Sequence, residues 1–403
     1  MTAPAAGTSV PAIATVTAAA MAVSVFPSLA LGILAGFLID DLTIGRTELG
    51  IAVAAISGVA AATSLRAGRL TDLRGGRTAM LVVFSLGAIA IGGLALAPSY
   101  PLLLAFTLVA GLCSGVSNPA TNKVIVETLV PGRRGLVTGV KQAGEMVAVV
   151  ACGGVLPAVA VTAGWRPALG VAVLVPLVAL AAVLRVIPRR PLVDAARPPA
   201  GHVTAPLAPG VVWLAVYAGF MGVAGNAVTA YMPLYAQESI GLHVTVAGVV
   251  MAVMGAVATA GRIVWAELAE RSGDFSRFLA VNAVLAVASV ASLWLAGALD
   301  HPLPLLLGAA GWGASLLSFG SVAMLAVMAM STPDSAGRAS GVVLTGFSLG
   351  LMVGPPLFGY LTDTTGAYDS SLAVVIGVLV AAVVTTIAWR LADRRRARDA
   401  GPA

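Results

Sequence analysis

The sequence predicts an all-α membrane protein with twelve transmembrane helices in two pseudo-symmetric six-helix bundles. Composition, twelve long apolar runs and a repeat of about half the chain predict this fold. Of the 403 residues, 59% are hydrophobic and 10% are charged, whereas soluble domains have roughly 45–50% apolar and about 25% charged residues. Lipid is therefore the solvent for most of the chain.

Twelve apolar runs are long enough to cross a bilayer, which takes about 20 residues per helix. Each run must be helical, because lipid offers no partner to an unpaired backbone group. The first run follows a segment without Lys or Arg and exceeds the apolar core of a signal peptide, so we expect a retained span. The runs cover residues 13–38, 47–67, 78–97, 101–122, 135–161, 167–187, 211–236, 245–265, 278–298, 303–330, 341–362 and 371–391.

A segment rich in Pro, Ala and Arg divides these runs into six and six. It extends from Pro188 to Pro209 and has too little apolar material for a folded domain. We therefore expect an N-terminal six-helix bundle at residues 1–187, a cytoplasmic central linker at 188–209, and a C-terminal six-helix bundle with a basic cytoplasmic tail at 210–403.

The basic residues lie almost entirely on one side of the predicted spans. With the N-terminus inside, 20 of the 23 Lys and Arg residues fall in inner loops or at inner helix ends. Arg46 and Arg166 fall outside, and Lys141 lies within a span. This excess predicts a multi-pass protein of the cytoplasmic membrane, the cell inner membrane, with both termini in the cytoplasm. The basic tail then favours contact with anionic lipid heads, and we expect no nucleic-acid partner.

The sequence lacks the motifs of enzymatic chemistry. It has no Gly-Lys-Ser/Thr loop for ATP, no nucleophile–base arrangement and no metal-ligand cluster. We therefore expect no enzyme activity, no cofactor and no metal site. A channel or receptor is the alternative of another class, but a channel requires a ring of filter groups, and the sequence shows none.

Two internal similarities relate the halves of the chain. The loop at residues 68–77 shares an acid and a later glycine with residues 266–274, and its Asp72 lies 198 residues before Glu270. A glycine pair of the fifth run recurs in the eleventh at an offset of 206 residues: Gly135 and Gly144, then Gly341 and Gly350. Since each repeat contains six spans, we expect parallel halves related by an axis along the membrane normal.

The first of these loops resembles the signature loop of the major facilitator superfamily, Gly-x-x-x-Asp-Arg-x-Gly-Arg-Arg. Leu73 and Gly76 stand where the family usually has Arg. We expect Asp72 to be buried or half-buried at the inner face, where a helix N-terminus or an arginine could satisfy it. The resemblance implies that this helix is the eleventh span, near Gly341, and that the loop switches conformation; a solvated tight turn is the alternative. The residues of the two loop copies that we expect to act in the switch are Gly68, Asp72, Gly75, Arg77, Glu270 and Arg271.

Two charged residues lie deep within the fifth run. Lys141 and Glu145 are four residues apart and so share a helix face, although a charge at bilayer depth costs about 2.5–3.5 kcal/mol on insertion scales. They form a self-neutralising pair, or Lys141 reaches toward the inner surface, or both face a water-filled cavity. In the cavity, Lys141 attracts an anionic group and Glu145 is the proton-coupling candidate.

The resemblance also implies that the first, fourth, seventh and tenth spans line the substrate path. Polar side chains there are binding candidates, and packing between helices is the alternative. With the neighbours of Glu145 in the fifth span, the substrate or cavity candidates are Lys141, Gln142, Asn118, Asn122, Asn226, Tyr231, Trp312 and Ser315.

The resemblance implies a secondary transporter that works by alternating access. Thr107 stands where many proton-coupled members carry Arg, and the fifth span lacks the Gly-Pro pattern of many antiporters. We therefore favour proton-coupled uptake or exchange of a small polar or anionic metabolite over proton-driven efflux of drugs or other apolar compounds. The expected partners are this small-molecule substrate, a proton or other coupling ion, and the lipid bilayer; we expect a monomer.

Overall fold

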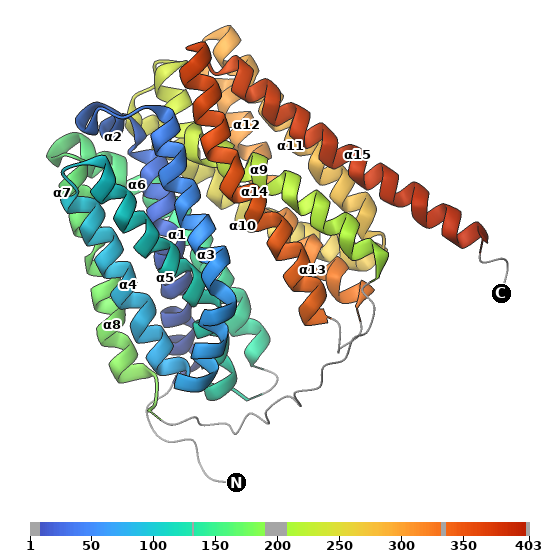
Figure 1. Ribbon diagram of the computed structural model, residues 1–403, viewed down its shortest axis with the longest axis horizontal. Coiled ribbons are helices and arrows are strands. Elements are labelled where there is room, and N and C mark those ends of the chain that lie inside the picture. Colours follow the sequence, from blue (N-terminus) through green and yellow to red (C-terminus); the bar gives the residue numbers. More distant parts are fainter. Residues whose placement is uncertain (1–8, 131–132, 190–207, 332–335, 400–403) are drawn as a thin grey trace. The chain divides into compact units, whose positions relative to one another are not determined.

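The computed structural model describes residues 9–130, 133–189, 208–331 and 336–399. Within these ranges the chain forms fifteen α-helices and no strand (Figure 1). Twelve helical segments are long and apolar enough to cross a membrane. The predicted all-α membrane fold with twelve spans is therefore confirmed.

The first six spans are formed by eight helices. They are α1 (Val10–Ile33), α2 (Ala35–Leu42), α3 (Arg46–Arg74), α4 (Gly76–Leu96), α5 (Tyr100–Thr128), α6 (Arg134–Ala163), α7 (Trp165–Ala172) and α8 (Leu174–Val186). The last six spans are formed by seven helices. They are α9 (Pro209–Glu238), α10 (Val244–Ser272), α11 (Phe275–Leu299), α12 (Pro302–Ala314), α13 (Phe319–Met330), α14 (Ala336–Thr365) and α15 (Asp369–Asp399).

The chain divides into two compact units. Unit 1 takes in residues 1–44 and 55–200, and unit 2 takes in residues 45–54 and 201–403. The first residues of α3 thus group with unit 2 and the remainder of that helix with unit 1. Most of the predicted linker at 188–209 lies outside the described residues, and the predicted domain boundaries stay a prediction.

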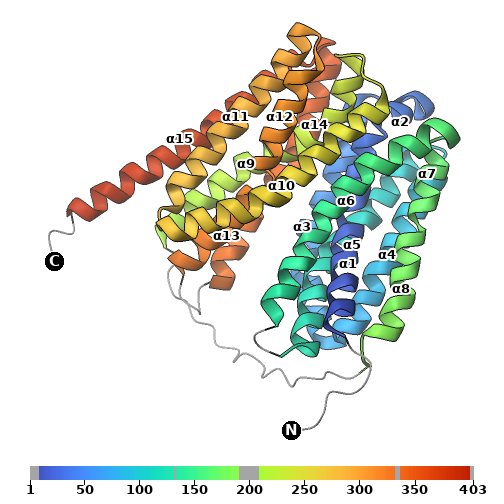
Figure 2. The ribbon, with the colours of Figure 1, turned by 180° about the vertical axis from the view of Figure 1, so that it is seen from behind.

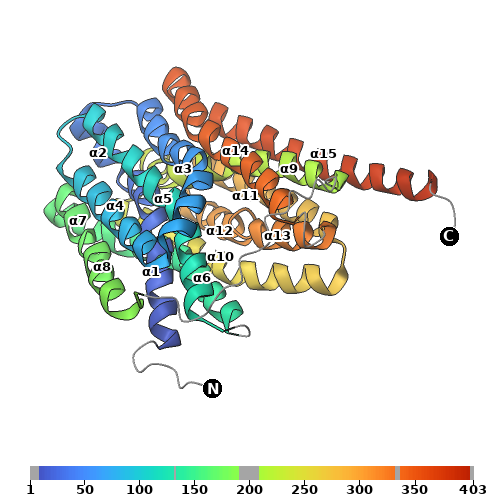
Figure 3. The ribbon, with the colours of Figure 1, turned by 60° about the horizontal axis from the view of Figure 1, so that its bottom comes forward.

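Helix pairings inside unit 1 recur inside unit 2. In unit 1, α1 packs against α6 and α4 against α5 and α8 (Figures 1 and 2). In unit 2, α9 packs against α14, and α11 against α12 and α15 (Figure 3). In span numbers, the first span pairs with the fifth as the seventh does with the eleventh. These three pairings therefore recur between equivalent spans of the two units.

Two of the repeated glycines, Gly144 and Gly350, lie where these helix pairs come into backbone contact, whereas Gly341 meets nothing within 4 Å. A Cβ atom at Gly144 of α6 would meet the carbonyl of Ala18 in α1, and one at Gly350 of α14 would meet the carbonyl of Gly219 in α9. Small residues allow such backbone contact between helices in lipid. Gly144 and Gly350, which are 206 residues apart, thus mark equivalent helix contacts in the two units.

The outward faces of the helices are apolar. Val178 of α8 keeps 68% of its surface accessible, Ile263 of α10 keeps 66%, and Val147 of α6 keeps 63%. Large apolar side chains at mid-span would be unfavourable against water but match a hydrocarbon surround. The exposed surface is therefore suited to lipid.

Three predicted spans are interrupted rather than continuous. The first is broken at Leu34, the sixth at Val173, and the tenth between Ala314 and Phe319. A break inside a membrane helix frees backbone carbonyl groups, which must then find partners within the protein. The partners at the third break belong to the candidate site and are described below.

Candidate functional site

A buried lysine in unit 1 gathers several of the predicted site residues. Lys141 of α6 is 2% exposed. Its Nζ donates hydrogen bonds to Asn118 Oδ1 at 2.9 Å and to Asn122 Oδ1 at 2.7 Å. The two asparagines are four residues apart on α5 and so present their amides on one face. The structure therefore assembles this cluster from two neighbouring spans.

The Lys141 cluster has unused capacity for an anion. An ammonium group has three donors, and two of them are accounted for among the described residues. Amide oxygens accept these bonds but carry no net charge. Glu145, one turn along α6, interacts electrostatically with Lys141, and both asparagines are exposed. The cluster therefore holds a cation beside one carboxylate, next to two asparagines that are exposed.

Gln142 adds a second polar group beside Lys141. Its Oε1 is buried and has no hydrogen-bond partner among the described residues. Leaving a buried acceptor unpaired costs about 1–3 kcal/mol. Such a group at the edge of a polar cluster is suited to a ligand donor or a water molecule. Gln142 thus stays a candidate for binding.

The predicted candidates in unit 2 are occupied in helix packing. Asn226 of α9 donates to the carbonyl of Leu351 in α14 at 2.9 Å. The Tyr231 hydroxyl donates to the carbonyl of Arg46, and its ring stacks on Phe358 with centroids 4.9 Å apart. These contacts match the packing alternative, and the binding role of Asn226 and Tyr231 stays a prediction.

Trp312 and Ser315 are both fully buried, at 0% exposed. The indole Nε1 of Trp312 donates to Thr229 Oγ1 of α9 at 3.2 Å. Ser315 Oγ donates to the carbonyl of Gly311 at 2.7 Å, within its own helical turn. The structure therefore places the two residues at the interrupted tenth span of unit 2, and their binding role also stays a prediction.

The interruption of the tenth span is held by side chains of α10. Trp265 Nε1 donates to the carbonyl of Ala314 at 2.5 Å, and Arg262 Nε donates to the carbonyl of Leu317 at 3.0 Å. Ser318 Oγ donates to the carbonyl of Ala258 in α10 at 3.1 Å. Carbonyl groups freed by the break are thus satisfied by donors from the neighbouring helix, which keeps the break compatible with lipid.

Sequence reasoning missed the role of Arg262. We counted it only among the inner basic residues. The available signal was its position: it lies ten residues before the end of a span-length helix that ends at Ser272. A cation at that depth requires a partner. The partner, the backbone carbonyl of Leu317 in the interruption of the tenth span, could not be predicted from side-chain types.

An ion-pair cluster forms in unit 2 around the first residues of α3. Asp363 Oδ1 accepts from the backbone N–H of Arg46 at 3.1 Å, and Asp363 Oδ2 accepts from that of Thr47 at 2.7 Å. This carboxylate therefore caps the N-terminus of α3. Arg46 Nη2 lies 2.7 Å from Glu238 Oε2, and Tyr368 donates to the same oxygen at 2.5 Å. Burial and the Glu238 carboxylate raise the pKa of Tyr368 well above its usual range.

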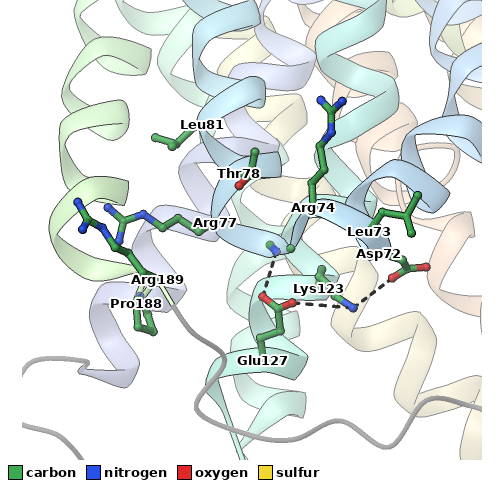
Figure 4. A pocket seen from close by; sticks show the side chains of 12 residues that line it. Asp72, Leu73, Arg74, Arg77, Thr78, Leu81, Lys123, Glu127, Pro188 and Arg189 are labelled. Atoms are coloured by element: carbon green, nitrogen blue, oxygen red, sulfur yellow. Dashed lines mark hydrogen bonds and ion pairs between the residues drawn. The ribbon is translucent and has the colours of Figure 1, made fainter.

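The predicted switch loop is a tight turn, and the carboxylate that satisfies the start of the next helix is Glu127 and not Asp72. Gly75 has a φ of 81° and caps α4. The backbone N–H of Gly76 donates to Glu127 Oε2 of α5 at 3.0 Å, so Glu127 satisfies the start of α4. Lys123 Nζ lies 3.3 Å from Asp72 Oδ1 and 3.8 Å from Glu127 Oε1 (Figure 4). Sequence reasoning missed Glu127, whose only signal was its spacing of four from Lys123.

The expectation that Asp72 is half-buried is wrong. Its side chain is 74% exposed, whereas that of Glu127 is 14% exposed, because Glu127 takes the place beside the start of α4. The expected contact near Gly341 stays a prediction. Arg77 donates to the carbonyls of Ile187 at 2.8 Å and Leu184 at 3.1 Å, and so caps the C-terminal end of α8.

The second copy of the loop keeps the turn but changes the capping group. Gly273 has a φ of 70°, which matches Gly75 at the predicted offset. Glu270 is exposed, and Arg271 pairs with Glu267 on the surface of α10. Asp274 caps α11, since its Oδ1 accepts from the backbone N–H of Arg277 at 3.0 Å. The two copies thus share the glycine, whereas the carboxylate that satisfies the start of the next helix comes from a different position in each copy.

Asp274 also connects α11 to α15. Its Oδ2 accepts from Arg390 Nη2 at 2.8 Å. Burial raises the pKa of Asp274, but hydrogen bonds from Arg277 and Ser276 and the Arg390 charge lower it by more, so the pKa lies below its usual value. The carboxylate is therefore ionised at neutral pH and keeps both its capping and its ion-pair contacts.

We expect Gly76→Ala to destabilise the protein and Gly68→Ala to stabilise it. A Cβ at Gly76 would lie 2.8 Å from the backbone nitrogen of Val124, whereas one at Gly68 meets nothing within 4 Å. Overpacking costs about 1–3 kcal/mol, while Gly to Ala in an open helical position gains roughly 0.5–1 kcal/mol. Thermal unfolding of the two purified variants would show opposite shifts. An unchanged Tm for Gly76→Ala would contradict the close packing of α4 on α5.

Among the described residues, no three His, Cys, Asp or Glu side chains are grouped so as to hold a metal ion. The charged groups described above are paired with lysine, arginine or backbone donors instead. The family model of the Major Facilitator Superfamily matches residues 12–321. The chain belongs to the Major Facilitator Superfamily. It is a multi-pass membrane transporter, and it is not an enzyme.

Relatives within the Major Facilitator Superfamily agree with this assignment. An uncharacterised MFS-type transporter of Mycobacterium tuberculosis is 28% identical over 331 residues, covering 80% of this chain and 72% of the relative. A hexuronate transporter of Bacillus subtilis is 27% identical over 137 residues, covering 34% of this chain and 32% of that protein.

Solved structures of the superfamily share the fold. A bacterial homologue of the human lysosomal transporter Spinster, in an inward-facing and unoccupied conformation, has a TM-score of 0.74 at 16% identity and covers 94% of this chain and 96% of its own. A D-xylose–proton symporter has a TM-score of 0.72 at 14% identity and covers 93% of this chain and 96% of its own. At these identities the likeness concerns the fold alone.

Proposed function

We propose that this protein is a secondary transporter that moves a small polar or anionic metabolite by alternating access, and that Lys141 binds the anionic group of the substrate. The observation that carries the proposal is a lysine that is 2% exposed yet hydrogen-bonded by two neutral amides. Charges within membrane spans mark substrate and ion pathways. A carboxylate or phosphate would supply the counter-charge that the amides lack.

Glu145 supports a coupling role in the same site. Its charge acts on Lys141. An arriving anion would compete with Glu145 for Lys141, and a carboxylate that loses its cation binds a proton more readily. Substrate binding would thus favour proton uptake by Glu145. This competition gives a route to proton-coupled uptake or exchange.

The relatives give limited support for the substrate class. A hexuronate is a carboxylated sugar, and the hexuronate transporter is similar to about a third of this chain. Lys141 also disfavours an apolar substrate, because an apolar compound would remove water from the cation without offering it a hydrogen bond or a counter-charge. Uptake or exchange of a polar anion therefore agrees better with the site than drug efflux does.

We also propose that the protein lies in the cytoplasmic membrane as a monomer with both termini in the cytoplasm. The distribution of basic residues, of which 20 of 23 lie on one side of the predicted spans, supports the orientation. This orientation is tested by labelling single introduced cysteines from each side of the membrane.

Counterflow in reconstituted vesicles tests the transport proposal. Vesicles loaded with one unlabelled compound should accumulate its labelled form, using sugar acids, small carboxylates, phosphorylated metabolites and matched neutral sugars as the panel. We expect saturable exchange of an anionic member. Exchange of apolar compounds alone would contradict the anion proposal.

The Glu145→Gln variant tests the coupling proposal separately. We expect it to keep counterflow but to lose accumulation driven by a pH gradient, while Glu145→Asp keeps both in part. Gradient-driven accumulation at the wild-type level in Glu145→Gln would contradict the proton role without affecting the role of Lys141.

A further inference from the structure

A cavity of about 580 Å³ lies in unit 1 beside the switch loop. Its walls come from the end of α3, the start of α4, the end of α5 and the residues that follow α8 (Figure 4). We propose that this cavity binds the phosphate group of an anionic phospholipid. This inference is independent of the transported substrate and of the Lys141 cluster.

The charge balance of the cavity favours an anion. Its lining includes four cationic side chains and two carboxylates, which are Arg74, Arg77, Lys123, Arg189, Asp72 and Glu127. Both carboxylates already contact Lys123, and Glu127 also accepts the backbone N–H of Gly76. Among the described residues, neither carboxylate forms an ion pair with Arg74, Arg77 or Arg189, so the positive charge of the cavity is in excess.

The arginines keep donors for a phosphate. A guanidinium has five N–H donors, and Arg77 uses two of its groups on the carbonyls of Ile187 and Leu184. Arg74 and Arg189 form no ion pair among the described residues, and both are exposed. Figure 4 shows Arg77 and Arg189 along one wall and Lys123 along another. Arginine forks match phosphate geometry.

The position of the cavity selects a lipid headgroup over a deep ligand. One membrane span begins at Gly76, another ends at Thr128 and a third ends at Val186, so the cavity lies at the level where spans meet the headgroups. Leu73 is 76% exposed and Leu184 is 54% exposed beside it. Basic pockets between helices at this level bind phosphate headgroups, and the leucines offer contact to the adjoining acyl chains.

The size of the cavity also agrees with a headgroup. Ligand pockets for small molecules measure about 300–1,000 Å³, and a lone phosphate ion would leave most of this one to water. A phosphate diester with its glycerol fills more of it. A lipid in the same leaflet is also held beside the cavity by the bilayer, which raises its effective concentration.

The experiment measures lipid binding to the purified full-length protein in mild detergent. Short-chain phosphatidylglycerol, short-chain phosphatidylcholine and inorganic phosphate are each titrated, with lipid retention followed by native mass spectrometry and stability by thermal unfolding. For the wild type we expect saturable binding of phosphatidylglycerol with a rise in Tm, and weak binding of phosphatidylcholine.

Two arginines of the lining provide the variants. We expect Arg189→Gln to weaken phosphatidylglycerol binding about fivefold and Arg74→Gln with Arg189→Gln to weaken it roughly 25-fold. Arg185→Gln is the matched control, since Arg185 is exposed in the last turn of α8 but is absent from the cavity lining. It removes the same charge from the same end of unit 1 and should leave the affinity unchanged.

Each contrary result overturns the proposal. Wild-type affinity in the double variant, or an equal loss in Arg185→Gln, would show that the cavity is not the site. Equal binding of phosphatidylcholine would remove the requirement for an anion. Inorganic phosphate that raises Tm as much as phosphatidylglycerol at equal concentration would make a free anion the ligand. The lipid-free Tm of each variant checks that the fold is intact.

Discussion

Lys141→Gln is expected to abolish transport of the anionic substrate while the protein remains folded. Removing one partner of a buried charge pair costs about 2–5 kcal/mol of binding free energy, so substrate affinity should fall by at least about thirtyfold. The fold should tolerate the change, because a glutamine amide can still donate to Asn118 or Asn122. Substrate counterflow and thermal unfolding of the same preparation measure both effects.

Lys141→Arg is the matched control for charge. It keeps the cation but changes the shape of the donor group, so partial transport is expected. Two outcomes would separate the interpretations of this lysine. A large fall in Tm in Lys141→Gln would mean that Lys141 mainly holds α5 to α6. Normal transport in that variant would remove Lys141 from the substrate path altogether.

Arg262→Met is expected to lower Tm and slow transport together. The change leaves the carbonyl of Leu317 without its donor at the interrupted tenth span. A buried acceptor that loses its partner costs about 1–3 kcal/mol, and more when the donor was charged. The lost hydrogen bond should change how α12 and α13 are held together. Transport should slow because the superfamily resemblance assigns this span to the substrate path.

Arg271→Met on the same helix is the control. Its side chain is 73% exposed, and its partner is Glu267 one turn away. Such surface pairs contribute about 0–1 kcal/mol, so Tm and transport should stay near the wild type. If both variants unfold at the wild-type temperature, the contact of Arg262 with the tenth span contributes nothing measurable. An equal loss in both would indicate a general effect of charge on α10.

Features governed by the solvent could be predicted from the sequence. Each apolar run had to become a helix, because lipid leaves no other way to pair the backbone. Lys141 stood out for the same reason, since a charge at depth needs partners. Asn118 and Asn122 of the preceding span were predicted only as substrate candidates, and their contact with Lys141 was not predicted. The structure brings these three side chains together.

Contacts between side chains and backbone could not be predicted. Glu127 binds the N–H of Gly76, and Arg262 and Trp265 bind carbonyls at the tenth-span break. Backbone groups are the same at every residue, so the sequence does not mark which of them will be freed. The break was also hidden, because glycine and serine near Ser315 are equally common where helices simply pack.

The similarity between the two loop copies also led to one wrong prediction, which is the burial of Asp72. The sequence offers an acid at the same place in each copy, Asp72 and Glu270, and both are exposed. The carboxylates that secure the following helices are Glu127 and Asp274. A repeat preserves the glycine that its backbone requires, whereas any nearby carboxylate can satisfy a helix start.

The interrupted tenth span has a consequence for biosynthesis. Its halves, α12 with 13 residues and α13 with 12 residues, are each too short to cross a bilayer, which takes about 20 residues. The two halves must therefore enter the membrane together, with their freed carbonyls already shielded. Since α10 precedes them along the chain, the ribosome delivers Trp265 and Arg262 before the carbonyls that they bind, so the acceptors of the late-made span meet donors that are already in place.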